Sequence, residues 1–265
     1  MSQAASYSLA ELTIAAASEA WRGNGEILAT GIGTVPRLAA ALAKLTHSPE
    51  LMLTDGEAFL VEEPVPLGPK GRAAMKPSGW MPYHRVFDVL WSGRRHAMVM
   101  PAQIDRWGQT NISALGDFKK PKVQMLGVRG FPGNSINHPN SMFVPNHSQR
   151  VFVAGEVDVV SSAGYKPDRW PDGARPSRVD LRLIVTDLCV MDFAGPGNAV
   201  RVRSLHPGRS RKEIEDATGF PLVFADPLPT TRAPTADELQ IIRRLDPDDL
   251  RAAVIKGNPA GARTA

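Results

Sequence analysis

The feature that most constrains the fold is an N-terminal strand, glycine turn and helix, GEILATGIGTVPRLAAALAKL, at residues 25–45. The apolar run ILA predicts a short buried strand, Gly31 and Gly33 mark the turn, and the helix is predicted from Val35 onward. A second apolar run at residues 51–54 follows this helix at the spacing of a βαβ crossover. Because such a crossover joins parallel strands and covers them with a helix, the segment predicts an α/β fold.

The rest of the chain continues this alternation of strands and helices. Further strands are expected at residues 96–100, 122–126, 150–153, 179–185 and 200–205. Helices are expected at residues 8–21, 83–91, 211–218 and 235–244 and from residue 247 onward. Capping boxes at Ser8-x-x-Glu11 and Thr235-x-x-Glu238 mark two of the starts, whereas residues 62–82, rich in Pro and Gly, read as irregular. The prediction is a mostly parallel or mixed sheet flanked by helices.

Length and composition fit a globular protein of the cytoplasm. With 265 residues and 43% hydrophobic content, the chain can form one core, and we expect a single domain at residues 1–257 with a flexible tail at residues 258–265. No apolar run approaches the roughly 18 residues of a membrane span, and the first twenty residues do not resemble a signal peptide. The single cysteine, Cys189, lies in the apolar run LIVTDLCVMDF and is expected to fill the core.

Charge and histidine spacing argue against nucleic acid and metal as partners, and the lack of a long apolar run argues against a membrane. The net charge is only +4 and the Lys and Arg residues are scattered, without the basic stripe and interleaved aromatics of a nucleic-acid binder. The six histidines show neither an HxxxH pair nor a His/Cys cluster with ligand spacing. We therefore expect no nucleic acid, no membrane and no catalytic metal among the partners.

The most informative segment is MPAQIDRWGQTNISALGDFKKPKVQMLGVRGFPGN, at residues 100–134. Polar residues Gln103, Asp105 and Asn111 follow an apolar strand, and several glycines beside them mark tight backbone paths. Because ligands of α/β sheets bind at loops after the carboxyl ends of strands, this segment is a candidate binding region.

Several strings together resemble one enzyme family. AQIDRWGQTNIS followed by GDFKKPKVQMLGVRG resembles the β subunit of class I coenzyme A transferases of the glutaconate type. GIGTVP is similar to the Gly-x-Gly-x-Pro turn of that family, and SLHPGRSRKEIEDATGF and PTADELQIIRRLDP resemble its C-terminal part. The resemblance covers about residues 30–256. It implies a CoA-transferase-like open sheet related to NagB and Rossmann folds, an acyl-CoA substrate, an α subunit as partner, and no cofactor beyond the coenzyme A of the substrate.

One position departs from the family in a way that changes the expected chemistry. In the transferases the strand after the first helix ends in Glu-Ser/Asn-Gly, and that glutamate attacks the acyl-CoA; this chain has Thr54-Asp55-Gly56 there. Without the carboxylate, covalent transfer by this route is lost and water is the natural nucleophile. TDG, GWMPYHRVFDVLWSGRRH and VRGFPGN resemble the actinobacterial steroid-ring-cleaving hydrolase subgroup, which implies hydrolytic opening of a cyclic β-oxo acyl-CoA in cholesterol catabolism.

Two alternatives stay open at this point. A true CoA-transferase subunit would need Asp55 or Glu57 as a displaced carboxylate. A binding module, such as the ligand sensor of a transcription regulator, would need an attached helix-turn-helix, which the first twenty-five residues do not supply.

The expected roles of the site residues follow from the turns and from the resemblance. Thr54 and Asp55 would shape the vacated nucleophile position, with the general base on the α subunit. The oxyanion or coenzyme A would be bound by Gly31, Gly33, Gln103, Gly127 and Gly130. Arg129 would clamp a substrate carboxylate, and the substrate would also be contacted by Asn134, Trp80 and Tyr83. Each also has a structural reading, as a turn, a loop or a core residue.

Overall fold

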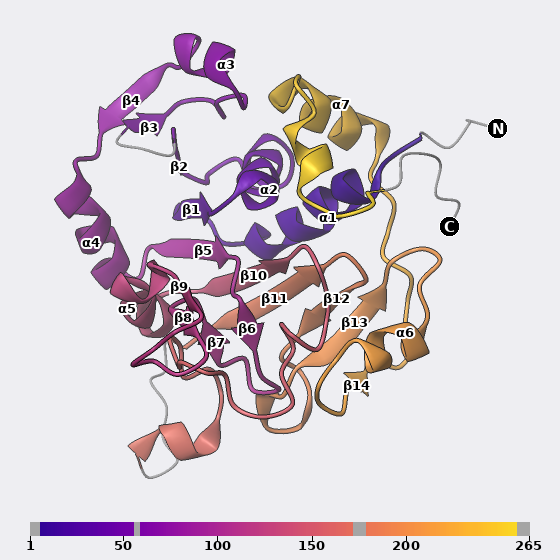
Figure 1. The fold of residues 1–265 in the computed structure, drawn as a ribbon. Helices are drawn as coiled ribbons and strands as arrows, with labels where there is room; N and C mark the ends of the chain where they lie inside the picture. Colours follow the sequence, from indigo (N-terminus) through magenta and orange to yellow (C-terminus); the bar gives the residue numbers. More distant parts are fainter. Residues whose placement is uncertain (1–5, 56–58, 172–178, 259–265) are drawn as a thin grey trace. The chain divides into compact units, whose positions relative to one another are not determined.

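The computed structural model describes residues 6–55, 59–171 and 179–258 (Figure 1). The chain forms two compact units: unit 1 contains residues 1–99 and 232–265, and unit 2 contains residues 100–231. The two units are each compact, but this does not show whether they fold separately or together. The single domain at residues 1–257 therefore stays a prediction. The predicted tail lies outside the described residues, except for Asn258.

Unit 1 is built from both ends of the chain. Its helices are α1 (Leu9–Ser18), η1 (Glu19–Trp21), α2 (Thr34–Leu45), α3 (Pro69–Ala73), α4 (Tyr83–Ser92), α7 (Ala236–Leu245) and η6 (Leu250–Ala253). Its strands are β1 (Leu28–Gly31), β2 (Leu53–Thr54), β3 (Phe59–Val61), β4 (Pro77–Trp80) and β5 (Arg95–Val99). In Figure 1, α1, α2 and α7 lie against one another, with α2 packed on β1.

The predicted βαβ crossover is confirmed. Strand β1 pairs in parallel with β5, with Leu28 opposite Arg95. On its other side Leu28 makes a parallel bridge to Met52, in the chain that returns from α2. Helix α2 therefore connects two parallel neighbours, as the spacing of the apolar runs indicates.

The Pro- and Gly-rich region after β2 is more regular than expected. Strands β2, β3 and β4 form a small antiparallel sheet, with Thr54 opposite Leu60 and Phe59 opposite Trp80. The short helix α3 also lies within residues 62–82, so the prediction of an irregular excursion there is wrong. Backbone pairing of two short strands orders a segment whose composition favours turns.

Unit 2 is organised around a mixed sheet. Its helices are η2 (Gly127–Arg129), α5 (Phe131–Asn137), η3 (Pro167–Arg169), η5 (Pro196–Asn198) and α6 (Arg211–Asp216). Its strands are β6 (Gln103–Ile104), β7 (Thr110–Asn111), β8 (Ala114–Leu115), β9 (Val123–Gln124), β10 (Asn140–Val144), β11 (Leu181–Thr186), β12 (Cys189–Asp192), β13 (Arg201–Leu205) and β14 (Val223–Phe224).

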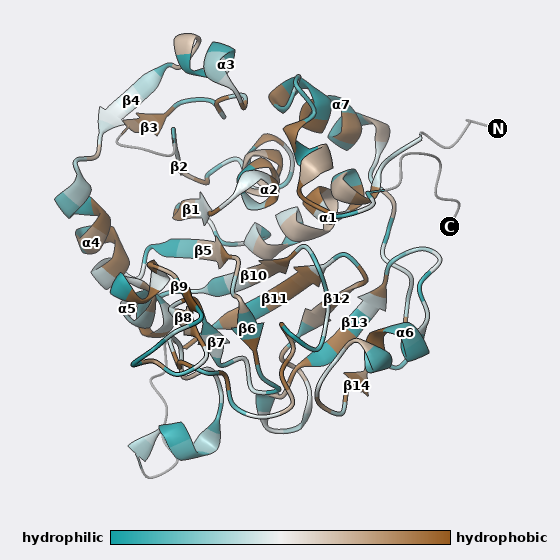
Figure 2. Cartoon of the chain, in the orientation of Figure 1, coloured by the Kyte–Doolittle hydropathy of each residue, from teal (hydrophilic) through white to brown (hydrophobic). Residues whose placement is uncertain are grey.

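Strands β10 to β14 lie side by side in chain order. The outer pairs β10/β11 and β13/β14 are parallel, whereas β12 runs antiparallel to both of its neighbours. Figure 2 shows hydrophobic residues concentrated along β11, whose side chains are nearly all buried. The α/β class with a mixed sheet flanked by helices is confirmed.

Two predicted elements are wrong. No strand forms at residues 150–153, where Phe152 makes a single bridge to Ile104 and stacks on His147. The last helix begins later than Pro247, as the 3₁₀ helix η6. Asp246 nevertheless caps this segment, because its carboxylate accepts hydrogen bonds from the backbone N–H groups of Leu250 and Arg251.

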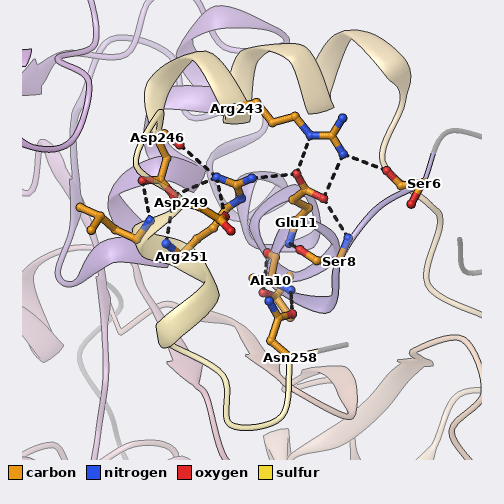
Figure 3. A network of polar contacts seen from close by, with 11 residues as sticks. Ser6, Ser8, Ala10, Glu11, Arg243, Asp246, Asp249, Arg251 and Asn258 are labelled. Atoms are coloured by element: carbon orange, nitrogen blue, oxygen red, sulfur yellow. Dashed lines mark hydrogen bonds and ion pairs between the residues drawn. The ribbon is translucent and has the colours of Figure 1, made fainter. Parts of the chain in front are cut away.

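A partly buried ionic network joins the two ends of the chain in unit 1 (Figure 3). The Glu11 carboxylate on α1 accepts hydrogen bonds from Arg243 Nε at 2.8 Å and Arg251 Nη2 at 3.1 Å. Arg251 also pairs with Asp246 at 3.0 Å, and Asn258 Oδ1 accepts the Ala10 N–H. These contacts hold α1 against α7 and η6.

Cys189 is fully buried and burial raises the pKa of its thiol to about 12, which confirms it as a core residue. In the described parts of the chain, every helix is too short or too polar to cross a membrane.

Candidate functional site

A cavity of about 470 Å³ in unit 1 brings the first glycine turn and the vacated nucleophile position together. Its wall is formed by Ala29, Thr30, Gly31, Ile32, Gly33, Thr34, Arg37, Leu38, Ala40, Ala41, Leu53, Thr54, Pro64, Val65, Leu67 and Leu245. We call it the turn cavity. Its volume falls within the range of small-molecule sites, about 300 to 1,000 Å³.

The two glycines of the turn are needed for different reasons. A Cβ atom at Gly31 would overlap the carbonyl group of Pro36, so only glycine allows the end of β1 to approach the first turn of α2. Gly33 precedes α2 with φ at 105°, in the region that favours glycine. The sequence GIG is therefore what joins β1 to α2 this closely.

The same turn leaves backbone donors available on the cavity side. The Ile32 N–H is bonded to the Met98 carbonyl of β5, and the Ala29 N–H to the Met52 carbonyl on the other side. Because N–H groups alternate along a strand, that of Gly31 points away from β5, to the side of Met52. Gly33 gives α2 no side-chain cap, so the N–H groups of its first turn add donors beside Gly31.

Thr54 and Asp55 border different cavities. Thr54 lines the turn cavity. Asp55 lines a neighbouring cavity of about 210 Å³, and its Oδ1 accepts the Phe59 N–H at 3.1 Å, which links the end of β2 to the start of β3. Glu57, the other candidate carboxylate, lies outside the described residues. The alternation of side chains at the end of β2 thus separates the threonine from its acidic neighbour.

Sequence reasoning missed Arg37, on the first turn of α2. It lines both the turn cavity and the Asp55 cavity. Burial lowers the pKa of Arg37, and the nearby Asp55 carboxylate opposes this shift. The sequence does carry a signal: a cation in the first turn of a helix opposes the helix dipole, and Arg37 has alanine at both i+3 and i+4.

Gln103 lies in unit 2 and its carbonyl oxygen is engaged. Gln103 is buried, and its Oε1 accepts hydrogen bonds from Asn111 Nδ2 at 2.8 Å and from the Asp158 N–H at 2.9 Å. These contacts fix the loop after β6. A contact of Gln103 with coenzyme A stays a prediction.

The other candidates of unit 2 lie close together on η2 and α5. Gly127 begins η2 and packs against Ile112, where a Cβ atom would overlap that side chain. Arg129 ends η2 and is exposed, and its guanidinium makes no hydrogen bond with the described residues. Gly130 has open space around it, and the Asn134 side chain is buried on α5. The segment therefore presents one exposed cation and one accessible glycine.

Trp80 and Tyr83 do not line the turn cavity. They are 71% and 79% exposed, at the end of β4 and the start of α4. Phe87 and Trp91, one and two turns further along α4, are also exposed. The helix thus carries an aromatic face, and a role of Trp80 and Tyr83 as a substrate wall stays a prediction.

Among the described residues, His, Cys, Asp and Glu side chains form no group of three or more that could hold a metal ion. No family profile matches the sequence.

Known proteins resemble the chain over almost its whole length. The cholesterol ring-cleaving hydrolase IpdB subunit of Mycobacterium tuberculosis is 45% identical over 93% of this chain and 98% of that protein. One of the subunits of the 3-oxoadipate CoA-transferase of Pseudomonas knackmussii is 31% identical over 96% of this chain and 98% of that protein. The crystal structure of Rhodococcus jostii IpdAB matches with a TM-score of 0.87 and 41% identity, over 94% of this chain and 99% of that one.

Proposed function

Because this chain belongs to the coenzyme A transferase family of β subunits, and within it to the group of the cholesterol ring-cleaving hydrolases, we propose that it is the β subunit of an acyl-CoA hydrolase. The enzyme opens a cyclic β-oxo acyl-CoA in steroid catabolism. The observation that carries this proposal is Thr54: it lines the cavity beside the glycine turn, at the position where the transferases place their glutamate nucleophile.

The proposed reaction uses water in place of that glutamate. A base takes a proton from water, and the hydroxide adds to the ring carbonyl that is β to the thioester. When the tetrahedral anion collapses, the bond between this carbon and the α-carbon breaks, and the electron pair passes into the thioester as an enolate. Protonation of the α-carbon completes the ring-opened acyl-CoA, which now carries a carboxylate.

The glycine turn supports the anionic steps. The Gly31 N–H and the N–H groups that begin α2 would donate to the developing negative charge, whereas the Ile32 N–H is occupied by Met98. Losing one such donor typically costs about 3 kcal/mol of transition-state stabilisation. Thr54 would position the attacking water, and Asp55 would hold the turn that carries it.

The remaining candidates keep the roles expected from the sequence. Gln103, Gly127 and Gly130 would contact coenzyme A, Arg129 would clamp a substrate carboxylate, and Asn134, Trp80 and Tyr83 would contact the acyl group. If Arg129 is the clamp, Arg129→Lys weakens binding of the substrate far more than binding of a carboxylate-free analogue. Equal losses for both would remove Arg129 from the site.

The assembly and its setting are part of the proposal. The name of the IpdAB structure indicates an enzyme of two different subunits. We therefore expect this chain to pair with an α subunit, as a heterodimer or a doubled heterodimer, and the α subunit would supply the general base. No cofactor is needed beyond the coenzyme A of the substrate. The buried, free Cys189 is compatible with a reducing compartment, and we place the enzyme in the cytoplasm.

One experiment separates hydrolysis from transfer. The purified α/β complex is mixed with a cyclic β-oxo acyl-CoA in the presence and in the absence of an acyl acceptor, and then treated with hydroxylamine. Ring opening without acceptor, and without a trapped adduct, supports the hydrolase. A CoA ester on Asp55 or Glu57, with turnover only when acceptor is present, would instead identify a transferase. The β subunit alone should show little activity.

A further inference from the structure

Among the residues that the structure describes, Arg37 is the one charged residue that lines the turn cavity. The remainder of the wall is apolar, or consists of threonine hydroxyls and glycine backbone. Within the described chain, the Arg37 guanidinium makes no hydrogen bond or ion pair. A cavity with an apolar wall and one cation is suited to a ligand with an apolar body and one anionic group.

The position of Arg37 is unfavourable for the folded protein by itself. It stands in the first turn of α2, where the helix dipole repels a cation. Burial also disfavours its charge, and Asp55 supplies the nearby negative charge that opposes this effect. An anion in the turn cavity would relieve both costs, because a guanidinium binds a carboxylate through two parallel hydrogen bonds.

We infer that the turn cavity holds the acyl end of the thioester, and that Arg37 pairs there with a carboxylate of the acyl group. This inference rests on the proposed function in one respect: it takes the ligand to be a CoA thioester. The proposed ring opening itself generates such a carboxylate, so Arg37 would recognise the product and the anion that precedes it. Arg37 is then a specificity residue for carboxylated acyl groups.

The cavity size favours the acyl group over the phosphates of coenzyme A as the source of the anion. At about 470 Å³ the cavity can hold an acyl chain but not a whole CoA molecule. Its wall also includes Thr54 and the glycine turn, which are the proposed neighbours of the reacting carbonyl. The anion would therefore lie a few bonds from the thioester.

The test is a binding measurement on the intact α/β complex with non-hydrolysable thioethers. The probes are an S-(5-carboxypentyl) thioether of coenzyme A, its methyl ester, and the corresponding pair built on pantetheine, which lacks the phosphates. For Arg37→Gln we expect the acid to bind about 10- to 100-fold more weakly, the size typical of a charge-assisted pair, with less than about a threefold change for the ester. Arg37→Lys should recover part of the loss.

Arg94→Gln is the matched control, because Arg94 is exposed and lies outside the cavity wall. The melting temperature of each complex checks that the variants fold. Equal loss for acid and ester would overturn the inference, since Arg37 would then not read a carboxylate. Loss with the CoA pair but not with the pantetheine pair would also overturn it, by assigning the anion to a phosphate. Because no turnover is measured, the result is independent of whether the complex hydrolyses its substrate.

Discussion

Gly31 and Thr54 line the same cavity although they end different strands, β1 and β2. The bridge between Leu28 and Met52 sets this relationship, because it aligns the chain before Thr54 with β1. In a parallel arrangement the carboxyl ends of neighbouring strands reach the same edge. A side chain at position 54 therefore lies beside the donors of the glycine turn, whichever residue occupies it.

Replacing Thr54 with glutamate should convert the site toward covalent chemistry. In Thr54→Glu we expect ring hydrolysis to fall by about 100-fold, because the new side chain takes the place of the positioned water. We also expect a hydroxylamine-sensitive CoA adduct on residue 54, detected by mass spectrometry. Thr54→Gln, of the same size and without the charge, should form none. The same adduct on a different residue of the wild-type complex would contradict the account of this position.

Substituting Gly31, the first glycine of the turn, should lower the stability of the folded protein. In Gly31→Ala the Cβ atom overlaps the Pro36 carbonyl, so the first turn of α2 must move, at a cost of about 2 kcal/mol. Chemical denaturation measures this. Gly130→Ala is the control, because no atom would lie within 4 Å of the added Cβ. Unchanged stability of Gly31→Ala would show that β1 and α2 are not packed this closely.

Removing the charge of Glu11 should destabilise unit 1. Glu11→Gln leaves Arg251 buried with one partner fewer, which typically costs about 3 kcal/mol. Glu63→Gln, at an exposed residue that makes only a long ion pair with Lys76, should change the free energy of unfolding by less than about 0.5 kcal/mol. A Glu11→Gln protein as stable as wild type would show that the network in Figure 3 contributes little.

The Glu11 network also predicts an acid response. Burial raises the pKa of Glu11, but hydrogen bonds from Arg243 and the Ser8 N–H outweigh it and hold the pKa below the usual 4.5. As the pH falls, the Glu11 carboxylate is therefore protonated in the unfolded chain before it is protonated in the folded protein. The stabilisation by this carboxylate is lost as the pH falls below about 4.5. Thermal melts from pH 7 to pH 3 should fall less steeply for Glu11→Gln than for wild type. Parallel curves would assign the acid response to other groups.

Asp105 should change the pH dependence of stability in the direction opposite to that of Glu11. Burial raises its pKa from 3.8 to about 6, against the hydrogen bonds from the Gln109 and Trp107 N–H groups that lower it. The folded state then binds more protons between these values, so stability falls as the pH rises from about 4 to about 6. Asp105→Asn should be more stable than wild type at pH 8, by up to roughly 3 kcal/mol. A wild-type melting temperature that is flat across this range, or lower stability of Asp105→Asn at pH 8, would exclude this titration.

Local signals were enough to predict much of the fold. Both capping boxes form as the sequence indicates, at Ser8 and Thr235, because their partners are only three residues away. The strand expected at residues 150–153 does not form, for the opposite reason: Phe152 finds partners far away in the sequence, packing against the ring of Phe220 and bridging to Ile104. Burial by distant residues decides such a segment, and the local pattern does not report it.

The candidate site shows the same division. The convergence of Gly31, Gly33 and Thr54 could be expected from the βαβ spacing, because the crossover fixes which strand ends are neighbours. Arg37 was missed because its importance depends on the residues that surround it in space. The sequence alone does not tell that Arg37 is the one charged residue, among those that the structure describes, in the wall of the turn cavity.

The joining of the two chain ends in unit 1 has a consequence for synthesis on the ribosome. Unit 2 is one continuous stretch, so all of its strands have been translated before the chain is complete. Helix α1 is made first, yet the arginines that pair with Glu11 follow 232 and 240 residues later. A nascent chain that terminates before Arg243 would therefore carry a helix with an unneutralised acid on its packing face, so α1 can take its final place only once synthesis is nearly complete.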